Sequence, residues 1–316
     1  MYGYILKRFI SLVFVILGVS ILIFFMVRLI PGSALEVYLG TQVETTPKQM
    51  EELKAIFGED KPVLVLYGEW LSRIIRGDFG CSLRTSRPVL SDILSRLPLT
   101  LELTIFALCF SVLIGIPLGI LSSRKQNPFT GLVIRIAGLL GLSIPQFFLA
   151  ILFVMFFSSF KGWIPMGTYI SLSKNSILNL KMMFFPSLAL GGGLAAVIMR
   201  FTRYNILEVT QMDYIRTARS KGVSEKNILT KHVLKNALLP VITVLGFNAG
   251  YLMGGAIVIE EVFALPGMGR LVLYAIYQRD YPLLQGIVLI TTVFFVLINL
   301  FTDILYVYID PRIRYE

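Results

Sequence analysis

The sequence lacks most of the chemistry that enzymes use. It contains one histidine, His232, and two cysteines, Cys81 and Cys109, without the CxxC spacing or the Cys/His cluster of a metal site. It has no Gly-Lys step, so the P-loop pattern GxxxxGK[ST] is absent, and it has no Gly-x-Ser-x-Gly motif. These absences exclude a nucleotide-hydrolysing site of the P-loop type and the nucleophile of an α/β-hydrolase.

The isolated His and Cys residues have plain interpretations. On a helix His232 would share a face with Ile228 and Val233, so we interpret it as an interfacial side chain rather than a catalytic one. Cys109 lies inside an apolar run, so we expect no disulfide bond to Cys81. We expect no catalytic residue, no metal site and no bound cofactor in this chain.

Charged residues are also scarce. They make up 15% of the chain and apolar residues 56%, against about 25% and 45–50% in soluble domains. Six apolar runs approach the roughly 20 residues that a helix needs to cross a bilayer. They are Phe9–Val27, Leu103–Leu121, Ile136–Phe160, Met182–Met199, Ala237–Ile259 and Tyr281–Thr302. We predict an all-α membrane protein with six transmembrane helices. The first run exceeds a signal-peptide core of about 7–15 residues, so we expect a retained helix.

The net charge of +10 follows the expected topology. If the six spans alternate, one side of the membrane carries 15 of the 29 Lys and Arg residues, and the two short loops of the other side carry five. The positive-inside rule places both termini in the cytoplasm. The excess charge therefore requires no nucleic-acid partner.

The spans and their charges predict four segments. Residues 1–30 hold the N-terminal end and first span, 31–98 an extracytoplasmic helical cap, 99–309 the five-span core, and 310–316 a cytoplasmic tail. In the cap, a capping box at Thr46 starts a helix that can end at Gly58. A second helix contains Tyr67, Trp70, Leu71 and Ile74 and ends near Gly77. The cap can pack on the membrane domain or contribute to substrate binding.

Several polar or small residues interrupt the spans. Gly246, Gly250 and Gly254 share one helix face, which suits close packing within the chain or a moving interface between two subunits. Gln146 and Asn248 lie deep enough to line a polar pathway or to link helices by hydrogen bonds. Arg28 and Glu102 stand near the expected outer ends of their helices, where they can snorkel, pair with each other or border a pathway.

A basic, helix-forming segment separates the fourth and fifth runs. Between Arg200 and Lys235 it carries eight Lys or Arg residues against three acidic ones. A helix that continues from the fourth span can end at Gly222, and Ser224 can cap a second helix that runs to Pro240. We predict a helix–glycine–helix elbow in the cytoplasm. Such an elbow can lie on anionic lipid or dock on a protein.

The elbow resembles the EAA loop of ATP-binding-cassette importer permeases, in the form used by the dipeptide, oligopeptide and nickel branch. The similar residues are Arg216-Thr217-Ala218-Arg219, Lys221-Gly222 and Lys235-Asn236-Ala237-Leu238-Leu239-Pro240. Shorter similarities follow in order along the chain, at Arg28-Leu29-Ile30-Pro31-Gly32, Gly77-Asp78-Phe79-Gly80, Arg96-Leu97-Pro98, Ser143-Ile144-Pro145, Pro266-Gly267-Met268-Gly269, Arg279-Asp280-Tyr281-Pro282 and Asp310-Pro311-Arg312. Ser33 departs from the pattern, because Asp is common at that place.

The resemblance implies a type I ABC importer permease fold in a prokaryotic cytoplasmic (inner) membrane, and a set of partners. They are a paralogous permease subunit, two cytoplasmic ATPases that bind ATP and Mg²⁺, an extracytoplasmic solute-binding protein, the lipid bilayer and a peptide substrate. Under this resemblance the coupling residues are Arg216, Thr217, Ala218, Arg219, Lys221, Gly222 and Ser224. The alternatives are the same machine importing nickel or another metal chelate, and a passive channel or membrane scaffold.

Overall fold

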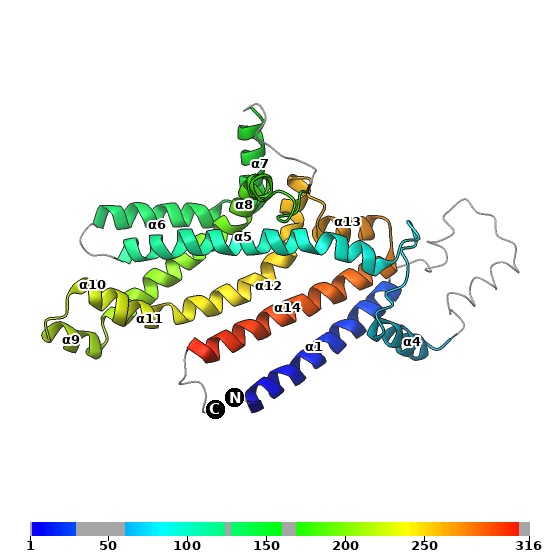
Figure 1. The fold of residues 1–316 in the computed structure, drawn as a ribbon, viewed down its shortest axis with the longest axis horizontal. Coiled ribbons are helices and arrows are strands. Elements are labelled where there is room, and N and C mark those ends of the chain that lie inside the picture. Colours follow the sequence, from blue (N-terminus) through cyan, green and yellow to red (C-terminus); the bar gives the residue numbers. More distant parts are fainter. Residues whose placement is uncertain (1, 30–60, 124–127, 160–168, 310–316) are drawn as a thin grey trace, which may run out of the picture. The chain divides into compact units, whose positions relative to one another are not determined.

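The computed structural model describes residues 2–29, 61–123, 128–159 and 169–309, and in these ranges the chain is largely helical (Figure 1). The predicted cap helix that begins at Thr46 lies outside the described residues. The helices are α1 (Tyr2–Leu29), α4 (Val63–Ile75), α5 (Val89–Ser123), α6 (Pro128–Ser143), α7 (Gln146–Ser158), α8 (Ser176–Thr210), α9 (Asp213–Ser220), α10 (Glu225–Asn227), α11 (Leu234–Ala237), α12 (Leu239–Val262), α13 (Met268–Tyr277) and α14 (Tyr281–Ile309). A π-helical turn, Ile228–Val233, joins α10 to α11.

Four of the described helices, α1, α5, α8 and α14, are long and apolar enough to cross a membrane. Two bent pairs bring the number of spans to six if each pair counts as one: α6 with α7, bent by 97°, and α10–α11 with α12, bent by 44°. The prediction of an all-α chain with six candidate spans is therefore confirmed, but α6–α7 is sharply bent, and α12 is bent relative to the helical segment before it.

The break between α6 and α7 has a local cause. Pro145 has no backbone N–H and disfavours a helical conformation at Ile144, and its own ψ of 139° is extended. The described part of the predicted run Ile136–Phe160 therefore folds as two helices that meet at a sharp corner, and Gln146 is the first residue of the second one.

The contacts divide the chain into two compact units. One contains Leu99–Pro266 and the chain from Phe295 onward, and the other contains Tyr2–Pro98 and Gly267–Phe294. The long helices α5 and α14 each contribute residues to both units.

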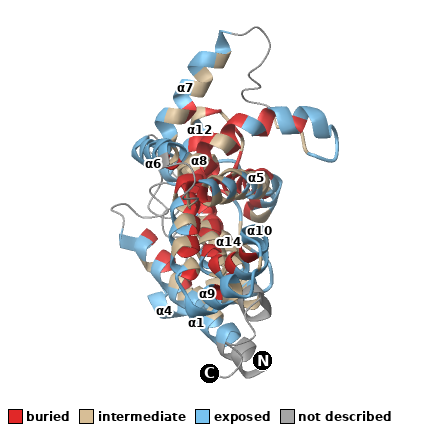
Figure 2. Cartoon of the chain, turned by 90° about the vertical axis from the view of Figure 1, so that its left-hand side faces the viewer, coloured by how far each residue is buried: buried red, intermediate tan, exposed pale blue. Residues whose placement is uncertain are grey.

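The first unit is built around α8, which contacts α6, α7 and α12 and is buried over much of its length (Figure 2). Its core joins Leu103 of α5, Met183 and Leu190 of α8, and Leu252 of α12. Glycines let α5 and α8 approach closely, because a Cβ atom at Gly191 would lie 2.4 Å from the carbonyl oxygen of Ala107.

At the start of α8 a short loop is fixed by side chains. Asn175 accepts a hydrogen bond from the Leu178 N–H at 3.1 Å and so caps the helix, and the Asn179 amide donates to the Ile170 carbonyl at 2.8 Å. The Tyr169 hydroxyl donates to Glu102 at 2.6 Å. Burial and this carboxylate both raise the pKa of Tyr169. Glu102 therefore pairs with a tyrosine of its own unit.

The second unit packs α4 against α1. The hydroxyls of Ser20 and Tyr67 lie 2.8 Å apart, and the ring of Phe24 contacts Tyr67 and Trp70 at centroid distances of 5.3 Å. The Arg28 guanidinium stacks on the same Phe24 ring at 3.6 Å. The predicted helix α4 is confirmed, and it lies on the first span.

Candidate functional site: the basic elbow

The elbow begins where α8 ends. Met212 is extended, with ψ of 147°, and α9 starts at the next residue with Asp213 in its first turn, where a negative charge suits the helix dipole. Figure 1 shows α9 and α10 as the two arms of a turn that leaves α8 and returns through α11 into α12. The predicted helix–glycine–helix elbow is present, but the expected continuous helix from the fourth span to Lys221 is wrong, because α8 ends at Thr210 and the extended Met212 separates it from α9.

A Schellman motif closes α9. Gly222 has φ of +75°, its N–H donates to the Arg219 carbonyl at 2.9 Å, and the Val223 N–H donates to the Ala218 carbonyl at 3.2 Å. The left-handed φ favours glycine at this position because it has no Cβ. Ser224 stands at the N-cap position of the next helix, but its hydroxyl makes no capping bond, so the expected side-chain cap is wrong.

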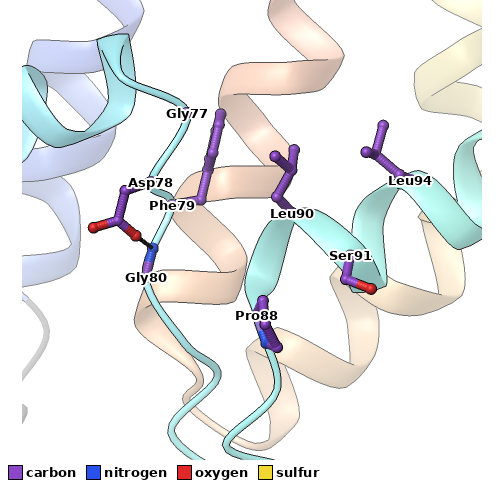
Figure 3. A pocket seen from close by; sticks show the side chains of 8 residues that line it. All are labelled: Gly77, Asp78, Phe79, Gly80, Pro88, Leu90, Ser91 and Leu94. Carbon is purple, nitrogen blue, oxygen red and sulfur yellow. Dashed lines mark hydrogen bonds between the residues drawn. The ribbon is translucent and has the colours of Figure 1, made fainter.

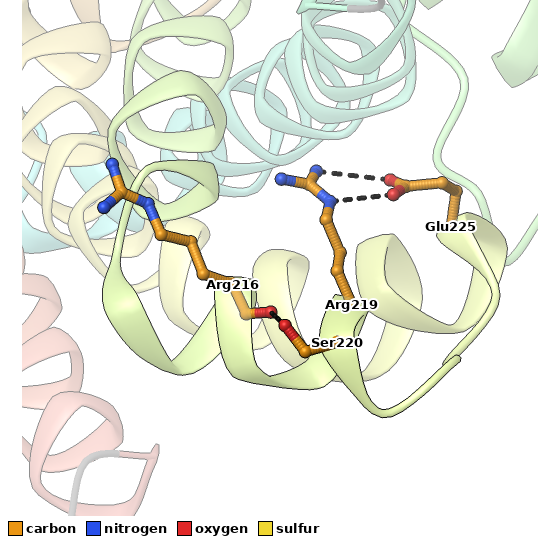
Figure 4. A network of polar contacts seen from close by, with 4 residues as sticks. All are labelled: Arg216, Arg219, Ser220 and Glu225. Carbon is orange, nitrogen blue, oxygen red and sulfur yellow. Dashed lines mark hydrogen bonds and ion pairs between the residues drawn. The ribbon is translucent and has the colours of Figure 1, made fainter.

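An ion pair links the two arms across the glycine. The Arg219 guanidinium donates to both carboxylate oxygens of Glu225, from Nε at 2.8 Å and from a terminal nitrogen at 3.3 Å (Figure 4). These hydrogen bonds lower the pKa of Glu225 and raise the pKa of Arg219. Because both side chains are exposed, the ion pair fixes the relative position of the two arms but contributes little to the stability of the fold.

The elbow has a small apolar core of its own. Its buried residues come from the end of α8, from α9 and from the second arm, and Ile120 of α5 packs against them. They are Ile206, Val209, Ile215, Ile228, Val233 and Ala237. Arg203 also donates to the Ser122 carbonyl at 3.1 Å, which ties α8 to the end of α5. The elbow is therefore packed against the ends of two membrane helices rather than suspended from them.

The second arm contains the π-helical turn, which the sequence did not indicate. The Tyr214 hydroxyl of α9 accepts from the Asn236 amide at 2.8 Å and donates to the His232 carbonyl at 3.4 Å. The side chain of His232 is exposed, although Ile228 and Val233 are buried. An exposed side chain can contact another subunit, so the interfacial position expected for His232 stays a prediction.

The seven residues that the sequence assigned to coupling do not all face outward. Arg216, Thr217, Arg219, Lys221, Gly222 and Ser224 are exposed, whereas Ala218 is partly buried and packs on the elbow core. Arg216 and Asp213 approach to 3.6 Å, and the Ser220 hydroxyl donates to the Arg216 carbonyl at 3.1 Å (Figure 4). The outer face of the elbow is thus a polar, mainly cationic surface.

The residues proposed for a pathway or interface are distributed along α7 and α12. A Cβ atom at Gly246 or Gly250 would collide with Thr302 or Phe295 of α14, whereas one at Gly254 would meet no atom within 4 Å. Gly246 and Gly250 therefore pack against a helix of the same chain, and Gly254 is open. The Asn248 amide donates to a carbonyl of its own helix at 2.7 Å. Gln146 lies beside Gly193, with 3.7 Å between its amide nitrogen and the position of a Cβ there.

Comparisons with known proteins agree with this architecture. Residues 1–104 match the family described as "Binding-prot-dependent transport system membrane comp, N-term". Residues 115–315 match the family described as "Binding-protein-dependent transport system inner membrane component". The chain belongs to this family. It is a multi-pass inner-membrane protein and a non-catalytic component of a binding-protein-dependent transport system.

Curated relatives align over the full length. The chain is 39% identical to "Dipeptide transport system permease protein DppB" of Alkalihalophilus pseudofirmus, over 100% of both proteins. It is 38% identical to "Glutathione transport system permease protein GsiC" of Salmonella choleraesuis, again over 100% of both. A chain of the MetNI methionine ABC transporter, solved in inward-facing conformations, shares the fold with a TM-score of 0.58 and 20% identity, over 72% of this chain and 100% of that one.

Sequence reasoning missed two buried polar pairs of this permease-family chain. Glu260 of α12 is fully buried and accepts a hydrogen bond from Thr100 of α5 at 2.6 Å. Asp280, before α14, is fully buried and accepts from the Ser82 hydroxyl. The acidic doublet Glu260-Glu261 at the end of an apolar run was the available signal for the first pair. No local pattern indicated the second.

Proposed function

We propose that this chain is one permease subunit of an ATP-driven importer for di- and oligopeptides. It forms part of the translocation pathway beside a second, paralogous permease, and two cytoplasmic ATPases bind ATP and Mg²⁺ and supply the energy. The observation that carries the proposal is the elbow: a basic surface, closed by Gly222, that is packed against α5 and α8 and continues into α12. The names of the full-length relatives support peptides as the cargo.

The proposal includes an orientation. Both termini and the elbow lie in the cytoplasm, because the positive residues concentrate on that side of the alternating spans. The segment that contains α4 and the loop before α5 then faces the extracytoplasmic side, together with the α7–α8 loop and α13. This orientation places the elbow where a cytoplasmic ATPase can reach it.

The build of the elbow suits the transmission of force. A surface arm attached by a flexible linker would move without moving the membrane helices, but this elbow shares a core with α5 and α8. The bond from Asn236 to Tyr214 and the pair between Arg219 and Glu225 hold its two arms together. A push on the outer face, where Arg216 and Lys221 are exposed, is therefore delivered to α8 and α12.

We also propose how the chain divides into domains and which residues lie near the pathway. The core of residues 99–309 forms the permease domain, and residues 31–98 form a cap on the extracytoplasmic side. On α12 Gly254 is open, and Phe247 and Tyr251 are 67% and 62% exposed. We place the second permease on this face of α12, with Asn248 and Gln146 nearer to the transported peptide.

Gly222→Pro tests the coupling proposal. Proline fixes φ near −65°, so it is incompatible with the φ of +75° at this position, whereas Asn accepts positive φ and makes Gly222→Asn the matched control. The chain is co-expressed with its partner permease and ATPases, purified through a tag on this chain, and reconstituted into proteoliposomes. Uptake of a labelled dipeptide is then measured with and without the solute-binding protein.

We expect the wild-type chain and Gly222→Asn to co-purify the ATPases and to transport the dipeptide. Gly222→Pro should lose most of the uptake and the stimulation of ATPase activity by the binding protein. Failure of the wild-type chain to retain the ATPases, together with normal uptake by Gly222→Pro, would overturn the proposal. A solute-binding protein that binds a nickel chelate and no peptide would overturn the proposal that peptides are the substrate.

A further inference from the structure

A short loop before α5 in the second unit is closed at its base, and we name Gly80–Val89 the clasp loop. The Val89 N–H donates to the Gly80 carbonyl at 3.0 Å, and the Ser82 N–H donates to the Arg87 carbonyl at 2.9 Å. Ser86, with φ of +54°, makes the reversal between them. Hydrogen bonds from the Arg84 and Thr85 N–H groups to the Ser82 hydroxyl oxygen fill the inside of the turn.

Asp280 anchors the clasp loop to the start of α14. Its carboxylate is fully buried and accepts hydrogen bonds from the Ser82 hydroxyl, from the Leu83 N–H at 3.2 Å and from the Leu283 N–H at 3.4 Å. A second link joins Arg84 Nε to the Gln278 carbonyl at 2.9 Å. The tip of the loop is therefore exposed but held in one shape, which lowers the entropy lost when a partner binds it.

A cavity of about 440 Å³ opens beside the clasp loop (Figure 3). Its lining is mostly apolar: Phe79, Leu90 and Leu94 face the space, and Pro88 and the backbone of Gly77–Gly80 complete it. Leu94 is 53% exposed within the chain. A cavity of this volume accommodates one or two apolar side chains of a partner.

The surroundings of the cavity are cationic. The segment from Gly77 to Val89 exposes Arg84 and Arg87, and Arg76 is exposed just before it. Arg279 is also exposed, next to Asp280, whose carboxylate binds the clasp loop. The exposed acid at the cavity is Asp78, and its carboxylate accepts the Gly80 N–H at 2.9 Å. The positive-inside rule does not account for this cluster of arginines, because the rule enriches Lys and Arg on the cytoplasmic side and these residues lie on the proposed extracytoplasmic side.

We propose that the clasp loop and its cavity form the docking site for an acidic lobe of the solute-binding protein, which inserts an apolar side chain between flanking carboxylates. The inference rests on the proposed function for the side of the membrane and for the partner. Binding of anionic lipid headgroups would require only a basic surface and no apolar cavity. A fixed loop beside an apolar cavity, with arginines around it, has the apolar centre and charged rim of a protein–protein contact.

Two variants test the docking site in the intact transporter, reconstituted in nanodiscs of uncharged lipid. Arg84→Glu with Arg87→Glu reverses the rim charge, and Ser91→Trp fills the cavity from an exposed lining position. Lys174→Glu with Lys181→Glu is the control: it makes the same change in net charge at exposed residues outside the site. Association and dissociation rates of the purified solute-binding protein are measured by surface plasmon resonance.

We expect the arginine variant to weaken binding about tenfold or more at low ionic strength, mainly through the association rate, and to lose much of this effect in 1 M salt, where the Debye length is about 3 Å. Ser91→Trp should raise the dissociation rate at both ionic strengths, and the lysine control should stay within about twofold of wild type.

Wild-type binding by both site variants, or an equal loss in the lysine control, would overturn the docking site. In either case the proposed function stands if the ATPases co-purify and dipeptide uptake continues. Absence of the ATPases from the wild-type preparation would overturn the proposed function and the docking site with it.

Discussion

Gly191→Ala measures how closely α5 and α8 pack. The new Cβ would lie 2.4 Å from the carbonyl oxygen of Ala107 and 3.2 Å from its Cα. These are backbone atoms inside a helix, so no side-chain rotation relieves the contact, and the helices have to separate by about 1 Å to restore normal van der Waals distances. Such overpacking costs about 1–3 kcal/mol.

The neighbouring Gly192 is the matched control. A Cβ there would lie 3.5 Å from a methyl group of Leu149, which is an ordinary contact. Both substitutions gain about 0.5–1 kcal/mol from the higher helix propensity of alanine. Gly192→Ala should therefore be neutral or stabilising, and Gly191→Ala should be less stable than wild type by about 0.5–2 kcal/mol.

Thermal unfolding of the purified protein in one detergent gives the comparison, followed by intrinsic fluorescence and by the loss of the monodisperse peak in size-exclusion chromatography. At about 2–4 °C per kcal/mol, the midpoint of Gly191→Ala should fall by a few degrees. A midpoint equal to or above that of wild type, with a lower one for Gly192→Ala, would refute the close packing of α5 on α8.

Two further predictions concern the elbow and α12. Glu225→Gln should lower the free energy of unfolding by about 0.2–1 kcal/mol, because the broken ion pair is exposed. Arg219 lowers the pKa of Glu225, so the stabilisation by the wild-type pair is present above the ordinary pKa of 4.5 and is lost as the pH falls through the lowered pKa. The thermal midpoints of the two proteins should therefore converge in acid. Gly246→Ala should lower the thermal midpoint because its Cβ meets Thr302, whereas Gly254→Ala should keep the midpoint and reduce co-purification of the partner permease; intact co-purification would argue against an interface there.

Local chemistry made the elbow predictable from the sequence. The end of α9 at Gly222 and the end of the α4 segment at Gly77 both follow from glycines, and both glycines have positive φ in the structure. For the third span, the sequence predicted an irregularity but not the angle of the bend. Pro145 indicated an irregularity, but the 97° bend depends on how α6 and α7 each pack on α8.

Other features lie beyond local sequence patterns. The bond between Ser82 and Asp280 joins residues 198 positions apart, and only the packed fold brings them together. The π-helical turn Ile228–Val233 has no marker in its composition. Similarly, Gly246 and Gly254 are equivalent in the glycine pattern, and their different surroundings come from the position of α14 within the first unit.

The length of α8 has a mechanical consequence. At about 1.5 Å per residue its 35 residues span roughly 52 Å, from the loop held by Asn175 to the elbow. Pro186 divides it into a part of about 15 Å toward Ser176 and a part of about 36 Å toward Thr210. One helix therefore joins the elbow to the loop held by Asn175, so a movement of Thr210 is carried along a single hydrogen-bonded element rather than through a series of loops.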